Sequence, residues 1–153
     1  MGVWMLNVHT LGGKEMLAAA RNAIDRGTHR AHLIGVTLLT SHGENDLTDL
    51  GLVGRIESQV ERLAEMAHET GLDGVVCSPQ EAATLRRSFG GNFLLVTPGI
   101  RPPGMAADDQ QRTLTPSEAV AQGADFLVIG RPITRADDPV SALEMINREI
   151  QLH

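Results

Sequence analysis

The chain has 153 residues, with 13 basic and 19 acidic side chains and a formal net charge of −6; 42% of the residues are apolar and 3% are aromatic. This length suits one domain with a sizeable core, and the acidic balance with scattered basic residues argues against a nucleic-acid-binding protein. The absence of a bilayer-length apolar run or a secretory signal, together with a single cysteine, argues against membrane partners, disulfides and a cysteine-based metal cage, so we expect a cytoplasmic protein.

The amino-terminal half alternates between strand and helix patterns. Residues 3–9 predict a strand, and apolar residues at helical spacing then predict a helix that ends at Gly27. Residues 32–39 predict a second strand, residues 40–51 a polar loop, and residues 52–70 a longer helix. The pattern is typical of consecutive β-α units.

The second half continues the alternation. The expected elements, in chain order, are a strand at 73–77, a helix opened by Ser78-Pro79-Gln80-Glu81, a strand at 93–97, a polar loop at 98–113, a helix opened by Thr115-Pro116-Ser117-Glu118, a strand at 125–129 and a last helix with Asp138 as its N-cap. Both quartets have the form of a capping box, with proline at the first helical position. Together the two halves contain about five β-α units without a linker or a second domain.

Two α/β architectures fit this alternation, an open doubly wound sheet and a (β/α) barrel. No strand leads into a Gly-x-Gly-x-x-Gly turn, so dinucleotide binding has no support. Polar residues instead follow nearly every strand, and barrel enzymes build their sites from such loops, with a phosphate site after the last two strands. The sequence therefore predicts a barrel-type fold.

The strongest candidate site lies in the loops after the last two strands. One reads Val96-Thr97-Pro98-Gly99-Ile100-Arg101-Pro102 and the other Val128-Ile129-Gly130-Arg131-Pro132. Glycine allows backbone N–H groups to approach an anion, and the planar guanidinium of arginine matches a phosphate with two hydrogen bonds. Two such pairs, each just after a buried strand, predict a phosphate site rather than solvated loops.

Other candidates are weaker. His9 is either an acid–base group or a hydrogen-bonded structural histidine, and we favour the structural role. Thr40 either binds substrate or starts a turn. Cys77 is expected to be a buried structural thiol. The remaining histidines lack metal-ligand spacing, so no metal is assigned. Lys14 follows a glycine turn and is poorly placed for Schiff-base chemistry.

The motifs together resemble the orotidine 5'-phosphate decarboxylase family. The resemblance rests on residues 96–102, on Asp109-Gln110 with Arg112, and on the stretch from Gly123 to Thr134, and it extends back through residues 71–78, 36–41 and 7–13. It therefore covers essentially the whole chain. The same patterns favour this family over sugar-phosphate decarboxylases and isomerases.

The resemblance implies a (β/α)₈ barrel, usually a homodimer, that converts orotidine 5'-monophosphate to UMP without a metal or an organic cofactor. It also implies that five residues bind the substrate: Thr40, Arg101, Gln110, Gly130 and Arg131. Arg101, Gln110, Gly130 and Arg131 would hold the phosphate, in agreement with the two-loop anion site.

The sequence departs from the family at its catalytic motif. The family carries Asp-x-Lys-x-x-Asp, which supplies a carboxylate beside the substrate carboxylate and an ammonium group for the carbanion. No Asp-x-Lys occurs in these 153 residues, so no catalytic residue is assigned. A complete barrel needs roughly 200 to 250 residues. We therefore expect residues 1–153 to be the C-terminal part of a barrel, its fourth to eighth units, that binds phosphate and is inactive alone; the alternative is a non-catalytic phosphate- or nucleotide-binding module.

Overall fold

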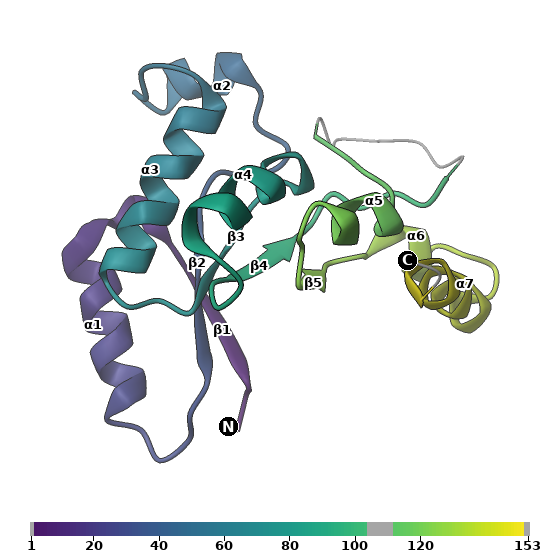
Figure 1. Cartoon of the computed structure of the whole chain (residues 1–153), viewed down its shortest axis with the longest axis horizontal. Helices are drawn as coiled ribbons and strands as arrows, with labels where there is room; N and C mark the ends of the chain where they lie inside the picture. Colours follow the sequence, from purple (N-terminus) through teal and green to yellow (C-terminus); the bar gives the residue numbers. More distant parts are fainter. Residues whose placement is uncertain (1, 104–111, 152–153) are drawn as a thin grey trace.

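The computed structural model describes residues 2–103 and 112–151. The elements along the chain are β1 (Met5–His9), η1 (Thr10–Gly12), α1 (Gly13–Asp25), β2 (His32–Val36), α2 (Glu44–Asp49), α3 (Ile56–Glu69), β3 (Gly74–Val76), α4 (Pro79–Phe89), β4 (Leu94–Thr97), α5 (Pro116–Ala121), β5 (Phe126–Leu127), α6 (Arg131–Thr134) and α7 (Pro139–Gln151) (Figure 1). Every expected strand is present, and each is shorter than its apolar run.

The five strands form one parallel sheet in the order β1-β2-β3-β4-β5. Each strand pairs with the next one along the chain, so every connection moves in the same direction across the sheet. A doubly wound sheet reverses its strand order at a switch point, whereas a barrel does not. The topology therefore confirms an α/β fold built as part of a barrel. Within the described residues β1 and β5 do not pair with each other, and the sheet remains open.

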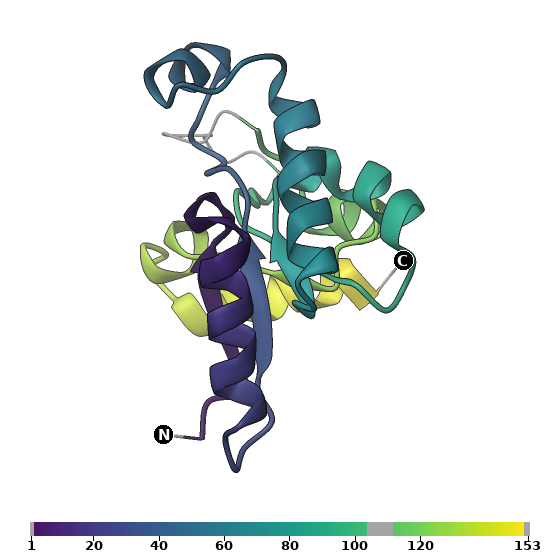
Figure 2. The same cartoon turned by 90° about the vertical axis from the view of Figure 1, so that its left-hand side faces the viewer.

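The main core lies between the sheet and the helices on one of its faces. Leu33, Val75 and Leu95 point to this face from three consecutive strands and are at most 1% exposed. Figure 1 shows α1 and α3 on one side of β1 and β2, and Figure 2 views that side with α1 in front of the strands. Glycine is required at Gly74, because an added Cβ would lie 2.1 Å from the carbonyl oxygen of Leu94 on the neighbouring strand.

The opposite face of the sheet carries a row of residues in register. His9, Val36, Val76, Val96 and Phe126 are successive partners across the five strands and so point to the same side.

The rings of Trp4, just before β1, and Phe126, at the start of β5, lie 5.2 Å apart between centroids. The two ends of the sheet are thus near each other at the amino-terminal ends of their strands, as a curled sheet requires. Trp4 is 58% exposed and Phe126 37% exposed, which leaves apolar surface on this face.

Two arginine–aspartate pairs tie neighbouring strands together in the same way. Asp125 precedes β5, and its Oδ2 accepts hydrogen bonds from the backbone N–H of Leu95 (2.7 Å) and from Arg86 on α4 (2.6 Å). Asp73 precedes β3, and its Oδ2 accepts from the N–H of Leu33 (2.7 Å) and from Arg21 on α1 (2.9 Å). Each aspartate therefore fixes the register between adjacent β-α units.

The structure corrects three local expectations. The polar stretch 40–51 contains the short helix α2, which packs through the buried Leu47. The stretch after Gly130, expected as a loop, forms the single turn α6. The last strand pairs only at Phe126 and Leu127, because its one partner, β4, ends at Thr97 and the chain turns away at Gly99.

The three predicted helix starts are confirmed. Ser78 and Thr115 cap α4 and α5 in capping boxes with Glu81 and Glu118. Asp138 Oδ1 accepts from the N–H groups of Val140 and Ser141 at the start of α7, each at 3.1 Å. Over the described ranges, no helix is long and apolar enough to cross a membrane.

Candidate functional site

The expected binding residues lie at the carboxyl edge of the parallel sheet. Thr40 follows β2, Arg101 follows β4, and Gly130 with Arg131 follows β5. Barrel folds place their active sites at this edge. Thr40 is 5% exposed and Arg101 9% exposed, so the fold buries two polar side chains among the loops of this edge. Gln110, the fifth expected residue, lies outside the described residues.

The loop after β4 is shaped by a glycine and a backbone bridge. Gly99 has a φ of +80°, a conformation that side-chain-bearing residues rarely adopt, and it turns the chain away from the strand. The buried Ile100 then forms a bridge with Leu114, and the N–H of Arg101 donates to the carbonyl of Leu114 at 2.9 Å. The backbone of Arg101 is therefore held in place by the segment that leads into α5.

Gly130 lies where β5 meets α6. Its carbonyl accepts from the N–H groups of Ile133 (2.9 Å) and Thr134 (3.0 Å), which closes the single turn. A Cβ at this position would meet open space, so close packing does not explain the glycine. Arg131 is half-buried, and because β5 pairs with β4, its loop lies next to the loop that carries Arg101.

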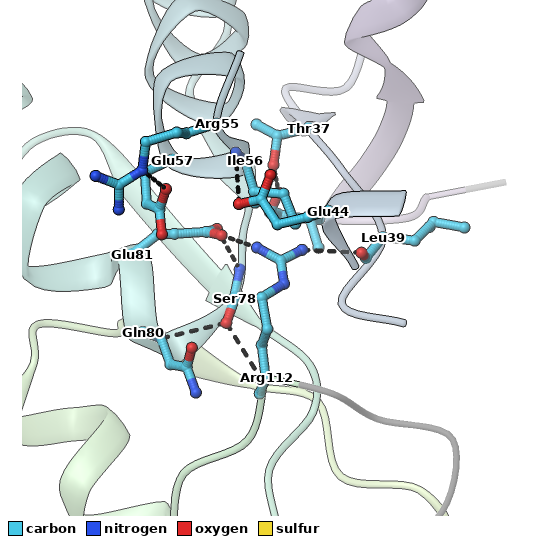
Figure 3. A network of polar contacts seen from close by, with 11 residues as sticks. Thr37, Leu39, Glu44, Arg55, Ile56, Glu57, Ser78, Gln80, Glu81 and Arg112 are labelled. Atoms are coloured by element: carbon cyan, nitrogen blue, oxygen red, sulfur yellow. Dashed lines mark hydrogen bonds and ion pairs between the residues drawn. The ribbon is translucent and has the colours of Figure 1, made fainter. Parts of the chain in front are cut away.

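A buried polar network joins the loops after β2, β3 and β4, and its centre is Arg112 (Figure 3). The guanidinium forms an ion pair with Glu81 through Nη1 and donates from Nη2 to the carbonyl of Leu39 at 2.9 Å. The side chains of Arg112 and Glu81 are 11% and 6% exposed. The other carboxylate oxygen of Glu81 accepts from the N–H of Ser78 at 2.9 Å, and Ser78 Oγ approaches the carbonyl of Arg112 at 3.4 Å.

Burial sets the ionisation of two groups near this network. Burial lowers the pKa of Arg112, although the surrounding acidic groups oppose this shift. Burial also raises the pKa of the Cys77 thiol to about 12, against the smaller opposite effect of Arg112. Cys77 is therefore protonated at neutral pH and buried, as expected for a structural thiol.

The only lysine of the sequence is paired with a carboxylate and exposed. Lys14 lies at the start of α1, its side chain is 64% exposed, and its Nζ lies 2.6 Å from Glu69 of α3. The hydrogen bond and the charge of Glu69 raise the pKa of Lys14. Among residues 2–103 and 112–151, no group of three or more histidine, cysteine or carboxylate side chains could hold a metal ion.

The residues that sequence reasoning missed are Glu81 and Arg112 in their shared role. From the sequence, Glu81 is identified only as part of a capping box, and Arg112 only as part of the motif that begins at Asp109. The two residues are 31 positions apart, so their pairing depends on the tertiary fold. The one available signal is that both residues lie in the connections that follow predicted strands, at the same edge of the sheet.

Comparison with known proteins gives the same family for nearly the whole chain. The model of the orotidine 5'-phosphate decarboxylase / HUMPS family matches residues 1–146. The chain is 53% identical over 150 residues to the orotidine 5'-phosphate decarboxylase of Hydrogenovibrio crunogenus and 55% identical over 149 residues to that of Chromohalobacter salexigens. These alignments cover 98% and 97% of the chain but 64% and 63% of the relatives.

Solved structures agree in fold. The crystal structure of the orotidine 5'-phosphate decarboxylase from Lactobacillus acidophilus superposes with a TM-score of 0.82 at 38% identity, over 97% of this chain and 64% of that one. The enzyme from Pyrococcus horikoshii shares the fold, with a TM-score of 0.69 at 24% identity over 97% of this chain and 61% of that one. The chain thus spans slightly less than two thirds of the proteins it matches, and it belongs to the orotidine 5'-phosphate decarboxylase / HUMPS family.

Proposed function

We propose that this chain is the phosphate-binding part of an orotidine 5'-phosphate decarboxylase. The observation that carries the proposal is the placement of Arg101 and Arg131 after the neighbouring strands β4 and β5, at the edge where Thr40 also lies. Two guanidinium groups at one edge suit a phosphate dianion. The relatives at 53% and 55% identity, which bear the decarboxylase name, supply the substrate, orotidine 5'-monophosphate.

The reaction determines what these residues have to do. Decarboxylation breaks the bond between C6 of the pyrimidine and its carboxylate, releases CO₂ and leaves an electron pair on C6, which then takes up a proton to give UMP. Arg101, Gln110, Gly130 and Arg131 would hold the 5'-phosphate, and Thr40 would contact the rest of the nucleotide. Binding the unreactive phosphate orients the ring for the chemical step. No metal or organic cofactor enters this proposal.

The groups that act on C6 are not among these residues. The sequence has no Asp-x-Lys-x-x-Asp stretch, and Lys14 is exposed and paired with Glu69. We therefore propose that the five β-α units correspond to the fourth to eighth units of a (β/α)₈ barrel, and that turnover requires further units that carry the lysine and aspartates. The proposal includes a cytoplasmic homodimer for the complete enzyme.

A non-catalytic phosphate- or nucleotide-binding module is the second candidate. The state of Lys14 favours it, because the one ammonium side chain of the sequence is 64% exposed and forms an ion pair with Glu69. The two candidates share the binding site and differ only in turnover. They are distinguished by supplying a polypeptide that carries the missing lysine and aspartates and then measuring turnover.

Binding is tested by titrating UMP into the purified chain in a calorimeter. We expect a measurable affinity that falls by at least about tenfold in Arg131→Gln, as for the loss of a charge-assisted contact. Arg148→Gln is the matched control, because Arg148 is 73% exposed on α7 and pairs only with Glu144 among the described contacts. No heat of binding at millimolar UMP would refute the proposed site.

Turnover is tested by following the absorbance of orotidine 5'-monophosphate. The chain alone should show none, and robust turnover by it would refute the assignment of the chemistry to other residues. Co-expression with the unmatched third of the Hydrogenovibrio crunogenus enzyme should restore turnover if this chain is part of a decarboxylase. Binding of UMP without any restored turnover would favour the non-catalytic module.

A further inference from the structure

We propose that Glu81 and Arg112 are positioning residues that hold the loop after β2 in a fixed place relative to the loop after β4. The inference rests on the proposed function in one respect: Thr40 and Arg101, which these loops carry, are taken as contacts to the nucleotide. Neither Glu81 nor Arg112 is assigned a contact with the ligand. Their effect on binding is exerted through the two loops.

The first link runs from Arg112 to the loop after β2. Nη2 of Arg112 donates to the carbonyl of Leu39 at 2.9 Å, and Leu39 is the residue directly before Thr40. Leu39 itself is 46% exposed, so its apolar side chain does not anchor this part of the loop. The backbone position just before Thr40 is therefore held by a side chain 73 residues further along the chain.

The second link runs from Arg112 to the loop after β4. Two residues after Arg112, the carbonyl of Leu114 accepts from the N–H of Arg101 at 2.9 Å, and Leu114 forms a parallel bridge with Ile100. The segment 112–114 thus pairs with the backbone of Arg101 while its first residue reaches Leu39. Thr40 and Arg101 are connected through one short stretch of chain.

The third link fixes Arg112 itself. Glu81 lies in the first turn of α4 and divides its carboxylate between two partners, the N–H of Ser78 at 2.9 Å and the guanidinium of Arg112 (Figure 3). Ser78 also contacts the backbone carbonyl of Arg112 through Oγ. Arg112 is therefore held at both its side chain and its main chain by residues at the amino-terminal end of α4.

The chemistry requires arginine at this position. The planar guanidinium presents Nη1 to Glu81 and Nη2 to Leu39 at the same time, and its rigid geometry sets the distance between the two partners. A lysine ammonium keeps the charge but is a single point on a flexible stem, so it cannot bridge the same two groups with fixed geometry. The pair is also more than four-fifths buried at both side chains, which makes its hydrogen bonds costly to replace with water.

The proposal is tested with Arg112→Lys and Glu81→Gln in the full chain, with Arg148→Lys as the exposed control. Backbone amide exchange is measured at residues 38–41 and at Ile100 and Arg101, and it is compared with the core amides of Val75 and Leu95. We expect exchange in the two loops to accelerate by about tenfold or more in Arg112→Lys while the core amides are unchanged, because only local opening is affected. Glu81→Gln retains an acceptor for Ser78 and should show a smaller effect at the same residues.

The affinity for UMP gives a second, independent measurement. It should fall by about tenfold in Arg112→Lys and less in Glu81→Gln, in step with the loop exchange. Unchanged loop exchange, or exchange that accelerates equally in the core, would overturn the positioning role. If the wild-type chain binds no UMP, the proposed function fails, and the exchange pattern still decides whether the pair positions the loops. If Arg112→Lys does not fold, Glu81→Gln, which keeps the helix cap, provides the same comparison.

Discussion

Replacement of Asp125 by alanine should strongly destabilise the fold. Its Oδ2 accepts from the N–H of Leu95 at 2.7 Å and from Arg86 at 2.6 Å, so the substitution removes the acceptor of both donors. A hydrogen bond to a charged group contributes about 1.5 to 3 kcal/mol. Since the side chains of Asp125 and Arg86 are 31% and 22% exposed, water compensates for part of this loss. We therefore expect the free energy of unfolding to fall by about 3 kcal/mol, at the low end of the range for two bonds.

Asparagine at position 125 separates the two contributions. Its amide oxygen can still accept from Leu95, but the charge that attracts Arg86 is lost, so the expected loss is about 1 kcal/mol. Arg86 also donates to the carbonyls of Gly90 and Phe93, which keeps its side chain in place in both variants. The difference between the variants therefore reports mainly on the backbone N–H of β4.

The measurement is urea unfolding followed by far-UV circular dichroism, with the midpoint and slope compared among the variants. Asp25→Ala is the matched control, because Asp25 is 61% exposed and pairs with Arg21 within one helix at 2.8 Å; it should change stability by less than about 0.5 kcal/mol. A fall in the free energy of unfolding of less than about 1 kcal/mol for Asp125→Ala, or equal falls for alanine and asparagine, would refute the proposal that Asp125 holds the register between β4 and β5.

Three further predictions concern single positions. Gly74→Ala should cost about 2 to 3 kcal/mol, because its Cβ would meet the carbonyl of Leu94 at 2.1 Å, whereas Gly91→Ala, with open space around it, should cost little; urea midpoints compare them. The buried Cys77, whose pKa burial raises to about 12, should resist a thiol reagent at pH 8 in the folded chain and react fully in denaturant; rapid reaction of the native chain would contradict its burial. Hydrogen bonds from the N-cap residue Thr115 lower the pKa of Glu118. The contribution of Glu118 to stability is therefore present above the unfolded pKa of roughly 4.3 and is lost as the pH falls through the lower folded value. Glu118→Gln should weaken this acid dependence of the unfolding midpoint.

The sequence predicts those parts of the fold that depend on neighbours along the chain. The capping boxes at Ser78 and Thr115 and the N-cap at Asp138 need only the next three residues, and all three are confirmed. The apolar runs also locate all five strands, because both faces of a parallel sheet are covered in a barrel fold. The length of β5 could not be predicted, since it depends on how far a neighbouring strand extends.

Features that depend on distant partners could not be predicted in the same way. Helix α2 has a glycine N-cap and one buried apolar residue, Leu47, so neither its start nor its periodicity is visible locally. The predicted positions of Thr40, Arg101 and Arg131 at one sheet edge followed from the alternation of strands and helices, and the structure places them there. The pairing of Glu81 with Arg112 depends on the close approach of two loops, which local patterns do not encode.

The contact between Trp4 and Phe126 gives the chain an intrinsic fluorescent probe. Trp4 is the one tryptophan of the sequence, which has no tyrosine, so excitation near 295 nm selects a single indole. That indole lies just before β1, with its ring 5.2 Å from that of Phe126 at the start of β5. The wavelength and quenching of its emission therefore report on the gap between the two ends of the sheet. Any polypeptide that inserts between β1 and β5 should therefore shift that emission, and the shift can be measured without an activity assay.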